Sequence, residues 1–319
     1  MANEFYEASA AARDILDRAE SALPGLLELM WSGPEEELQL TANQQPALVA
    51  AGVAAYAAYL EAGGEPAIVG AGHSLGEYTA LVASGSLALE DAVRLVRARG
   101  RYMQEAVPEG DGAMAAILKL DADVIERVAL EVSGSYSSGD EAAESGADQV
   151  VEIANYNAPG QTVLSGSRTA VAAASAKLKE LGGRVIPLKV SAPFHCSLMR
   201  PAAERLAVDL AATKFSQPRF PIICNVTARP LGAAADAAGL LEAQVTSSVR
   251  WVECVRQLAS FDASSATGPA LARPPRFIEF GAGEVLSNLV KRILPAPADG
   301  GAIDAHAIYD VETLEEVVA

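Results

Sequence analysis

Residues 67–83 read AIVGAGHSLGEYTALVA, and this stretch decides the fold. A short apolar segment runs into Gly72-His73-Ser74-Leu75-Gly76, and an apolar helical pattern follows. A strand that turns sharply into a helix around GxSxG is typical of a nucleophile elbow, which lifts a serine hydroxyl clear of the sheet. The glycines allow the strand and helix to approach, and the N–H of Leu75 is placed to bind an oxyanion. We therefore predict Ser74 as a nucleophile; the alternative is a chance GxSxG in an ordinary loop.

Apolar strands alternate with helical segments on both sides of the elbow. This alternation predicts an α/β fold with a mostly parallel sheet covered on both faces. A β-α-β-β-α order, closed by a further strand, predicts a small inserted subdomain at 110–188. The large catalytic subdomain is then 1–109 with 189–319. We also predict a surface loop at 134–149, one helix around 237–260 and a loop at 262–275.

Composition excludes several classes of protein. The 319 residues carry 24 Lys and Arg against 41 Asp and Glu, a net charge of -17, which argues against a nucleic-acid or anionic-membrane binder. Three widely spaced cysteines without CxxC suit a reducing compartment and form no zinc cluster. No apolar run is long enough for a membrane span, and the N-terminus lacks the pattern of a signal peptide. We expect a cytoplasmic protein with no metal.

A serine nucleophile needs a base, and the chain has three histidines. His73 adjoins Ser74 on a tight turn and would point elsewhere. His195, in VSAPFHCSLM, follows an apolar strand, where loop residues gather over the ends of parallel strands. His306, in DAHAIYD, lies near the C-terminus. We favour His195 and keep His306 as the alternative.

Arg99 lies at an unusual position for a charged residue, because it falls on the apolar face of a predicted helix. The helical pattern LALEDAVRLVRARGRYMQ puts it on one stripe with Ala92, Val96 and Met103. An arginine within an apolar stripe is costly unless it is paired. It either extends its stem past the core to solvent, or is a buried guanidinium that holds a carboxylate in a bidentate way.

Several motifs together resemble one family. They look like the motifs of the malonyl-CoA:acyl-carrier-protein transacylases of bacterial fatty acid synthesis, and their order and spacing match that family from about residue 20 to 295. The motifs are GHSLGEYTALVASG, RARGRYMQEAVPEGDGAMAAIL, NYNAPGQTVLSG, VSAPFHCSLM, CNVTARP, QVTSSVRW and FIEFGAGEVLSNLVKRI. The resemblance implies an α/β-hydrolase-like large subdomain with a ferredoxin-like insertion. It also implies ping-pong transfer of malonyl from malonyl-CoA to acyl carrier protein through a serine acyl-enzyme.

The resemblance also implies site residues. Ser74 would be the nucleophile and His195 its base and acid, oriented by the backbone carbonyl of Gln244. Arg99 would hold the malonyl carboxylate. Met103 and Val190 would line the acyl pocket, Asn157 would lie near coenzyme A, and Phe194 would exclude the methyl group of methylmalonyl. For Phe194 the alternative is core packing, and for Asn157 it is a turn. No cofactor is implied, because the coenzyme A thioester is the substrate, and we expect a monomer.

One feature departs from the family pattern. Family members open with an apolar strand and a GQGSQ-type loop that supplies an oxyanion donor, and this sequence shows neither. A misassigned start, a truncation or another segment that fills the gap would each account for the difference. We expect this form to fold or react poorly, because loss of one oxyanion donor alone costs roughly 10²–10³ in rate.

The charge is unevenly distributed, which bears on an acidic partner. Between residues 177 and 229 nine basic residues are interrupted by three acids, and this stretch flanks His195. It could steer an acidic carrier protein and the coenzyme A phosphates, or its charges could be scattered and solvated.

Three rival functions remain open. A serine hydrolase or thioesterase would use Ser74 with His306 and either Asp304 or Asp310, in the chain order of hydrolases. A polyketide-type acyltransferase would use the same residues as the leading hypothesis. A carrier-protein docking module would have lost activity.

Overall fold

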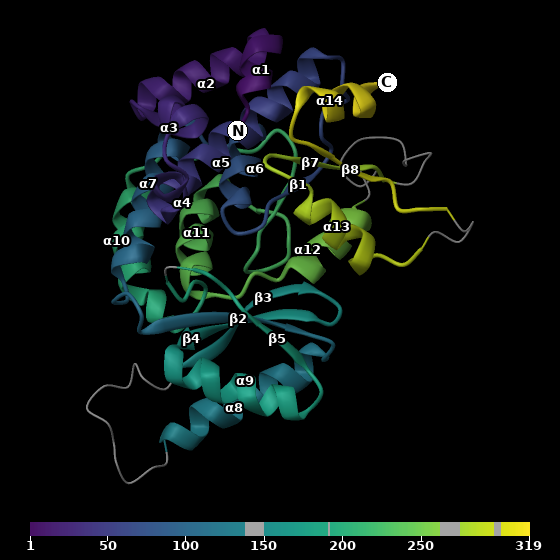
Figure 1. Cartoon of the computed structure of the whole chain (residues 1–319). Helices are drawn as coiled ribbons and strands as arrows, with labels where there is room; N and C mark the ends of the chain where they lie inside the picture. Colours follow the sequence, from purple (N-terminus) through teal and green to yellow (C-terminus); the bar gives the residue numbers. More distant parts are fainter. Residues whose placement is uncertain (138–149, 191, 262–274, 297–300) are drawn as a thin grey trace. The chain divides into compact units, whose positions relative to one another are not determined.

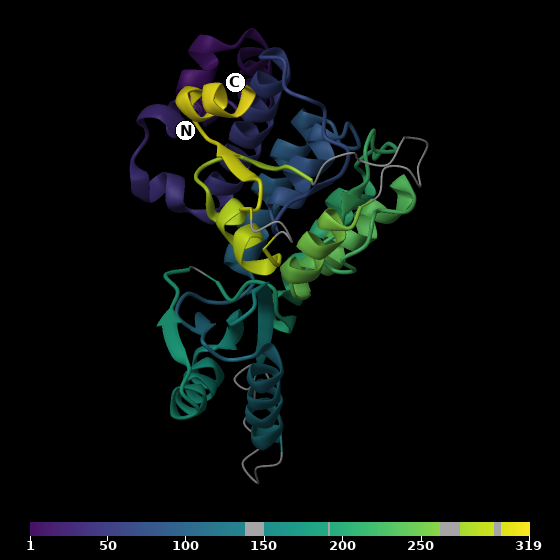
Figure 2. The ribbon, with the colours of Figure 1, turned by 90° about the vertical axis from the view of Figure 1, so that its right-hand side faces the viewer.

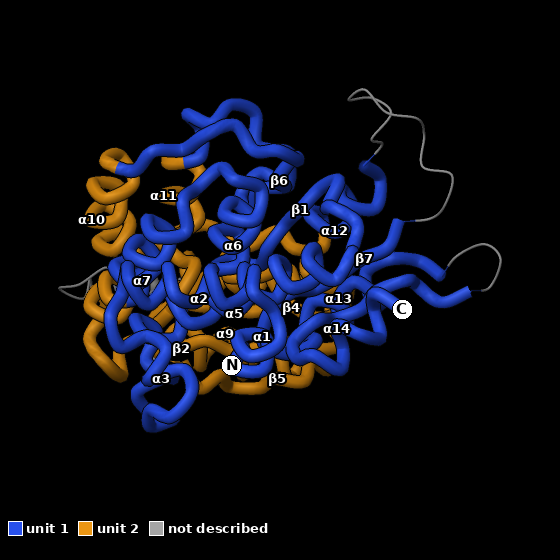
Figure 3. Tube along the Cα trace, turned by 90° about the horizontal axis from the view of Figure 1, so that it is seen from above, with its two compact units in different colours: residues 1–100, 213–237, 253–319 blue, residues 101–212, 238–252 orange. Residues whose placement is uncertain are grey.

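The computed structural model describes residues 1–137, 150–190, 192–261, 275–296 and 301–319. Most of the predicted loops at 134–149 and 262–275 lie outside these ranges. The chain divides into two compact units: the first comprises 1–100, 213–237 and 253–319, and the second 101–212 and 238–252 (Figure 3). The second unit contains the predicted insertion, 110–188, and extends beyond it on both sides. The boundaries of the insertion stay a prediction.

The first unit is mainly helical, with short strands. Helix α7 (Leu89–Glu105) begins in it, and α12 (Trp251–Ala259) ends in it. Its other elements, labelled in Figure 1 where there is room, are α1 (Asn3–Ala8), α2 (Ala10–Ala22), α3 (Leu26–Ser32), α4 (Glu35–Gln39), α5 (Thr41–Glu61), β1 (Gly70–Ala71), α6 (Gly76–Ala83), β6 (Ile222–Ile223), η3 (Ala234–Asp236), β7 (Phe277–Phe280), α13 (Val285–Ile293), β8 (Ala305–Ile308) and α14 (Val311–Val318).

Parallel pairing is present in the first unit, as the alternating pattern predicts. β1 pairs with β6, and β7 pairs with β8, both in parallel. The described residues form two separate two-stranded sheets rather than one continuous sheet. Within them, β1 pairs only with β6, and Ile68 just before β1 is 43% exposed. β1 is half-buried, whereas Ile222 and Ile223 of its partner β6 are fully buried.

Helix α5 forms the centre of the first unit. It is apolar all round, as buried helices are, and packs against α2 and α6. Its Gly52 lets the elbow helix approach, because a Cβ there would lie 2.9 Å from Thr79 Cγ2 and 3.2 Å from the carbonyl oxygen of Phe280. No helix in the described part of the chain is long and apolar enough to cross a membrane.

The second unit contains a four-stranded antiparallel sheet in the order β3-β4-β2-β5. α8 and α9 lie side by side against this sheet (Figures 1 and 2). The elements of the unit are β2 (Gly112–Leu118), α8 (Ala122–Ser137), β3 (Val151–Ala158), β4 (Gln161–Ser167), α9 (Arg168–Glu180), β5 (Arg184–Pro187), η2 (Ser197–Met199), α10 (Arg200–Ala211) and α11 (Ala237–Thr246), whose first residue belongs to the first unit.

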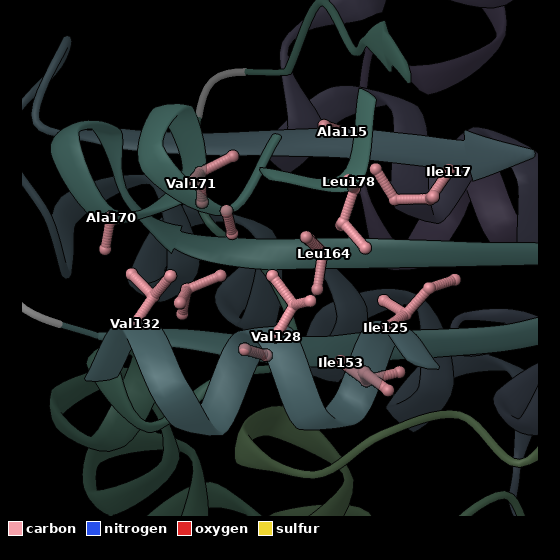
Figure 4. Close-up of a cluster of buried hydrophobic side chains, with 13 residues drawn as sticks. Ala115, Ile117, Ile125, Val128, Val132, Ile153, Leu164, Ala170, Val171 and Leu178 are labelled. Atoms are coloured by element: carbon pink, nitrogen blue, oxygen red, sulfur yellow. The ribbon is translucent and has the colours of Figure 1, made fainter. Parts of the chain in front are cut away.

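The core of the second unit lies between its sheet and its two helices. Figure 4 shows the side chains of Ile125 and Val128 on α8 and Leu178 on α9 gathered around Leu164 on β4. The alternation of β2 and β4 turns every second side chain toward this core. The other sheet face carries a smaller apolar cluster, against which Phe194 packs.

The structure corrects two predictions in and beside this unit. α8 continues to Ser137, so residues 134–137 are helical rather than part of a loop. The single helix predicted around 237–260 is two helices, α11 and α12. Between them the chain runs beside β3, where Val249 donates to the carbonyl of Ala154 and accepts from the N–H of Tyr156. These backbone bonds are available only to an extended segment and interrupt the helix.

Candidate active site

Ser74 lies on the turn between β1 and α6. Its φ of 51° is in the left-handed region, which costs a non-glycine residue of order 1–3 kcal/mol. A Cβ on Gly72 would collide with the backbone of Gly76, so only glycine fits at position 72. At position 76 a Cβ would meet open space, so that glycine is not required by packing. The turn has the strained geometry of a nucleophile elbow.

Two side chains hold this turn, and we did not predict either as a site residue. Asn225, two residues after the end of β6, accepts the N–H of Ser74 at 2.6 Å and donates to the carbonyl of Gly72 at 2.8 Å. Glu77 accepts the backbone N–H of Asn225 at 3.0 Å. The sequence carries a signal for Asn225, a polar residue at the end of the buried strand FPIIC, but strand pairing is needed to show which loop it reaches.

The N–H of Leu75 is the candidate oxyanion donor. It makes no hydrogen bond to the part of the chain that the structure describes, whereas the next N–H, of Gly76, donates to the carbonyl of His73. Leu75 is also the N-cap of α6, where the helix dipole favours negative charge.

Arg99 lies beside the nucleophile and is 2% exposed, which excludes a stem that extends to solvent. Its Nη2 donates to Ser74 Oγ at 3.0 Å, and its Nη1 donates to Gln45 Oε1 at 2.8 Å. Burial lowers the pKa of Arg99, while Tyr78 and Glu77 raise it. An arginine keeps its charge even when buried, so a cation adjoins the serine hydroxyl. Gln45 is a further residue that we did not predict.

His195 and Gln244 both belong to the second unit. His195 Nδ1 lies 2.9 Å from the carbonyl oxygen of Gln244, and both residues are buried. A carbonyl can only accept, so Nδ1 carries the hydrogen and Nε2 is left with the lone pair of a base. His195 also has a left-handed φ, of 60°.

The loop that carries His195 is anchored to β3. The Ser197 hydroxyl donates to one oxygen of Glu152 at 2.6 Å, and the Ser197 N–H donates to the other at 2.9 Å. Cys196 is fully buried, and burial raises its pKa to about 11, so it remains a thiol rather than a competing nucleophile.

The other predicted binding residues belong to the second unit. Met103 on α7 is buried, Val190 is 41% exposed beyond the end of β5, and Asn157 is half-buried on β3. Phe194 packs on a cluster that includes Met114 and Val163, as the core-packing alternative requires. The pocket roles of these residues stay predictions.

The rival histidine has different surroundings. His306 Nε2 lies 2.7 Å from Asp304 Oδ1, and both side chains are about half exposed. Asp310 caps α14 by accepting from the Thr313 N–H at 2.9 Å. No hydrogen bond in the described residues joins His306 to Ser74.

In chemical terms, the first unit provides a strained serine beside an arginine and a backbone donor, and the second provides a buried histidine in a defined tautomer. The sequence pattern of the family described as "Acyl transferase domain" matches residues 1–292. This chain belongs to the acyl transferase family.

Several relatives of this acyltransferase carry the same name. It is 41% identical over 317 residues to the malonyl CoA-acyl carrier protein transacylase of Bacillus subtilis (strain 168), covering 99% of this chain and 90% of the relative. It is 42% identical over 270 residues to that of Escherichia coli (strain K12), covering 84% and 80%. The predicted resemblance to this family is confirmed.

Solved structures agree. An acyl-carrier-protein S-malonyltransferase from Burkholderia pseudomallei 1710b aligns with a TM-score of 0.84 at 38% identity, over 98% of this chain and 93% of that one. A malonyl-transacylase in complex with a type II PKS acyl-carrier protein aligns with a TM-score of 0.85 at 37% identity, over 100% and 94%. The α/β fold class of this acyltransferase is therefore confirmed.

Proposed function

We propose that this acyltransferase moves malonyl from malonyl-CoA to the phosphopantetheine thiol of acyl carrier protein, through an acyl-enzyme on Ser74, in fatty acid synthesis. The observation that carries the proposal is the buried Arg99, which donates a hydrogen bond to Ser74 Oγ. A cation this close to the nucleophile suits an acyl group that ends in a carboxylate. A hydrolase of neutral esters has no use for it.

The first half-reaction loads the enzyme. His195 Nε2 takes the proton of Ser74 as Oγ attacks the thioester carbonyl, and the Leu75 N–H stabilises the resulting oxyanion. The carbon–sulfur bond then breaks, and coenzyme A leaves as a thiol with the proton from His195. Malonyl stays as an ester on Ser74, with its carboxylate on Arg99. The carbonyl of Gln244 keeps the imidazole in the required tautomer throughout.

The second half-reaction runs the same steps in reverse with a new thiol. His195 accepts the proton of the carrier's phosphopantetheine thiol, the sulfur attacks the ester, and Ser74 recovers its proton. No cofactor takes part, because the coenzyme A thioester enters as substrate. Met103 and Val190 line the acyl pocket, Asn157 lies near coenzyme A, and Phe194 fills the space that a methylmalonyl methyl would need.

The carrier protein is the partner we propose, and the solved complex of a related transacylase with its acyl-carrier protein supports it. Lys189 and Arg200 are exposed and have no acidic partner among the described residues, so they are available to an acidic surface. Lys177 and Arg205, by contrast, pair with Glu131 and Glu105. We further propose a cytoplasmic monomer.

Trapping the acyl-enzyme tests the proposal. The purified chain is incubated with radiolabelled malonyl-CoA and quenched, and the adduct is located by peptide mapping, with Ser74→Ala as control. Label on Ser74 that then transfers to holo carrier protein supports the transferase. Label that is discharged only to water would support the hydrolase. If Ser74 takes up no label, the inactive carrier-protein docking module would be supported instead.

A further inference from the structure

Asn225 connects the elbow to the neighbouring strand. Its side-chain oxygen accepts from Ser74 N at 2.6 Å, and its side-chain nitrogen donates to Gly72 O at 2.8 Å. The carboxamide therefore bonds to the chain on both sides of His73. Asn225 is fully buried, so water does not compete for either bond.

The backbone of Asn225 is fixed in turn by the elbow helix. Its N–H donates to Glu77 Oε2 at 3.0 Å, and Glu77, in the first turn of α6, is 2% exposed. β6, which ends just before Asn225, pairs in parallel with β1, which leads into the elbow. Strand, turn and helix are thus all tied to one residue, within one compact unit.

We propose that Asn225 is the positioning residue of the nucleophile, an inference that rests on the proposed role of Ser74. It acts in two ways. It holds Ser74 in the left-handed conformation that no serine prefers, and it occupies the N–H of Ser74. The next N–H along the chain, of Leu75, is thereby left as the elbow's donor to the oxyanion.

At neutral pH a carboxamide satisfies both partners and an ionised carboxylate does not. Ser74 presents a donor and Gly72 an acceptor, so the side chain between them must accept with one atom and donate with the other. Ionised aspartate has two acceptors and would set a negative charge against the carbonyl of Gly72. Alanine removes both hydrogen bonds, from the part-buried N–H of Ser74 and to the buried carbonyl of Gly72.

Asn225→Ala tests the proposal through the acylation step. We expect single-turnover acylation by malonyl-CoA to slow about 10²-fold, since misplacement of a reacting group by about 1 Å costs this much. The KM for malonyl-CoA should change less than about threefold, because Arg99 and Gln45 are untouched. The matched control is Ser84→Ala, which removes one buried hydrogen bond, to Leu81 O, at the other end of the same helix. The control should lose stability and keep its acylation rate.

Asn225→Asp supplies a readout that a purely structural role would not give. When protonated, the carboxyl donates to Gly72 O and accepts from Ser74 N, so it reproduces the carboxamide. We therefore expect the acylation rate of Asn225→Asp, divided by that of the wild type, to rise at least tenfold from about pH 8 to about pH 5.5, since burial favours the protonated acid. The measurement is made on folded protein, verified by circular dichroism at each pH, and it carries the test alone if Asn225→Ala does not fold.

A ratio that stays far below one at every pH, or acylation by folded Asn225→Ala within twofold of wild type, would overturn the proposal. A neutral fluorophosphonate that labels reactive serines separates this result from the proposed function. If the wild type reacts with the probe but not with malonyl-CoA, malonyl transfer is wrong. The positioning role then stands only if Asn225→Ala slows labelling and Ser84→Ala does not.

Discussion

The Nη1 atom of Arg99 donates a 2.8 Å hydrogen bond to the side-chain oxygen of Gln45, 54 positions earlier in the chain. The partner is a carboxamide, which orients the guanidinium without neutralising it. Nη2 of the same guanidinium donates a hydrogen bond to the hydroxyl oxygen of Ser74. Gln45 therefore sets the direction in which Arg99 presents its charge.

Arg99→Ala should affect malonyl far more than acetyl. The malonyl carboxylate loses a charged hydrogen-bond partner worth roughly 3–5 kcal/mol when buried, so loading should fall by about 10²–10³ or more. Loading from acetyl-CoA, which has no carboxylate, should fall less than about tenfold. Acyl-enzyme formation from each thioester measures this. Arg97→Ala, on the exposed face of the same helix, is the control. Equal losses for both thioesters would contradict the assigned role.

Gln45→Glu should place a carboxylate beside Arg99 that competes with the malonyl carboxylate for the guanidinium. The new carboxylate would bond the same Arg99 nitrogen and form an ion pair there, so the malonyl carboxylate would bind less well. We expect the KM for malonyl-CoA to rise about tenfold or more, with a smaller change for acetyl-CoA. Gln44→Glu adds the same charge at an exposed neighbouring position and should change neither. An unchanged KM would show that Gln45 does not govern carboxylate binding.

His195→Ala and His306→Ala separate the two candidate bases. Loss of a general base costs roughly 10²–10⁴ in rate, and we expect this loss in acylation for His195→Ala alone. His306, half exposed beside Asp304, should be replaceable with little effect on acylation. Rapid-quench measurement of acyl-enzyme gives both rates. A large loss of acylation rate in His306→Ala, with little loss in His195→Ala, would instead support the serine hydrolase.

Phe194→Ser should admit methylmalonyl. A methyl group is worth about 1–3 kcal/mol of discrimination, so the ratio of methylmalonyl to malonyl loading should rise about 10- to 200-fold. The variant should also unfold at a lower temperature, because Phe194 packs on an apolar cluster. Phe194→Leu, which keeps more of the bulk, is the control for packing. A loss of stability with no change in the ratio would leave core packing as the only role of Phe194.

Lys189→Glu should slow transfer to carrier protein at low salt. Reversal of one exposed charge weakens electrostatic steering, so kcat/KM for the carrier should fall several-fold at low ionic strength and approach the wild-type value at high salt. Lys291→Glu makes the same change of net charge on α13 of the first unit and should have no such effect. Identical salt dependence in both variants would argue against steering by Lys189.

The parts of the site that depend on residues close together in the sequence were predictable. A short strand, GxSxG and a helix predict the turn at Ser74, and the structure shows it. The helical stripe of Arg99 left two alternatives, a stem that extends to solvent or a buried guanidinium, and the structure shows the buried one. The family itself was predictable because seven motifs occur in order. The roles of the individual site residues stay predictions.

Gln45, Glu77 and Asn225 could not be predicted because their contacts join distant segments. Asn225 lies 151 positions from Ser74, and only the pairing of β6 with β1 brings the two together. The break between α11 and α12 was missed for a similar reason. The segment 247–250 is compatible with a helix locally, but β3 offers Val249 backbone hydrogen bonds that a helix would forfeit.

The left-handed backbone of Ser74 and of His195 sets activity against stability. Each conformation costs of order 1–3 kcal/mol for a residue with a side chain, which the rest of the fold must offset. A glycine at either position would relieve that cost and remove the reacting group. Selection for stability alone would thus favour glycine at both positions and yield an inactive protein. Ser74 and His195 therefore persist only while acyl transfer is under selection.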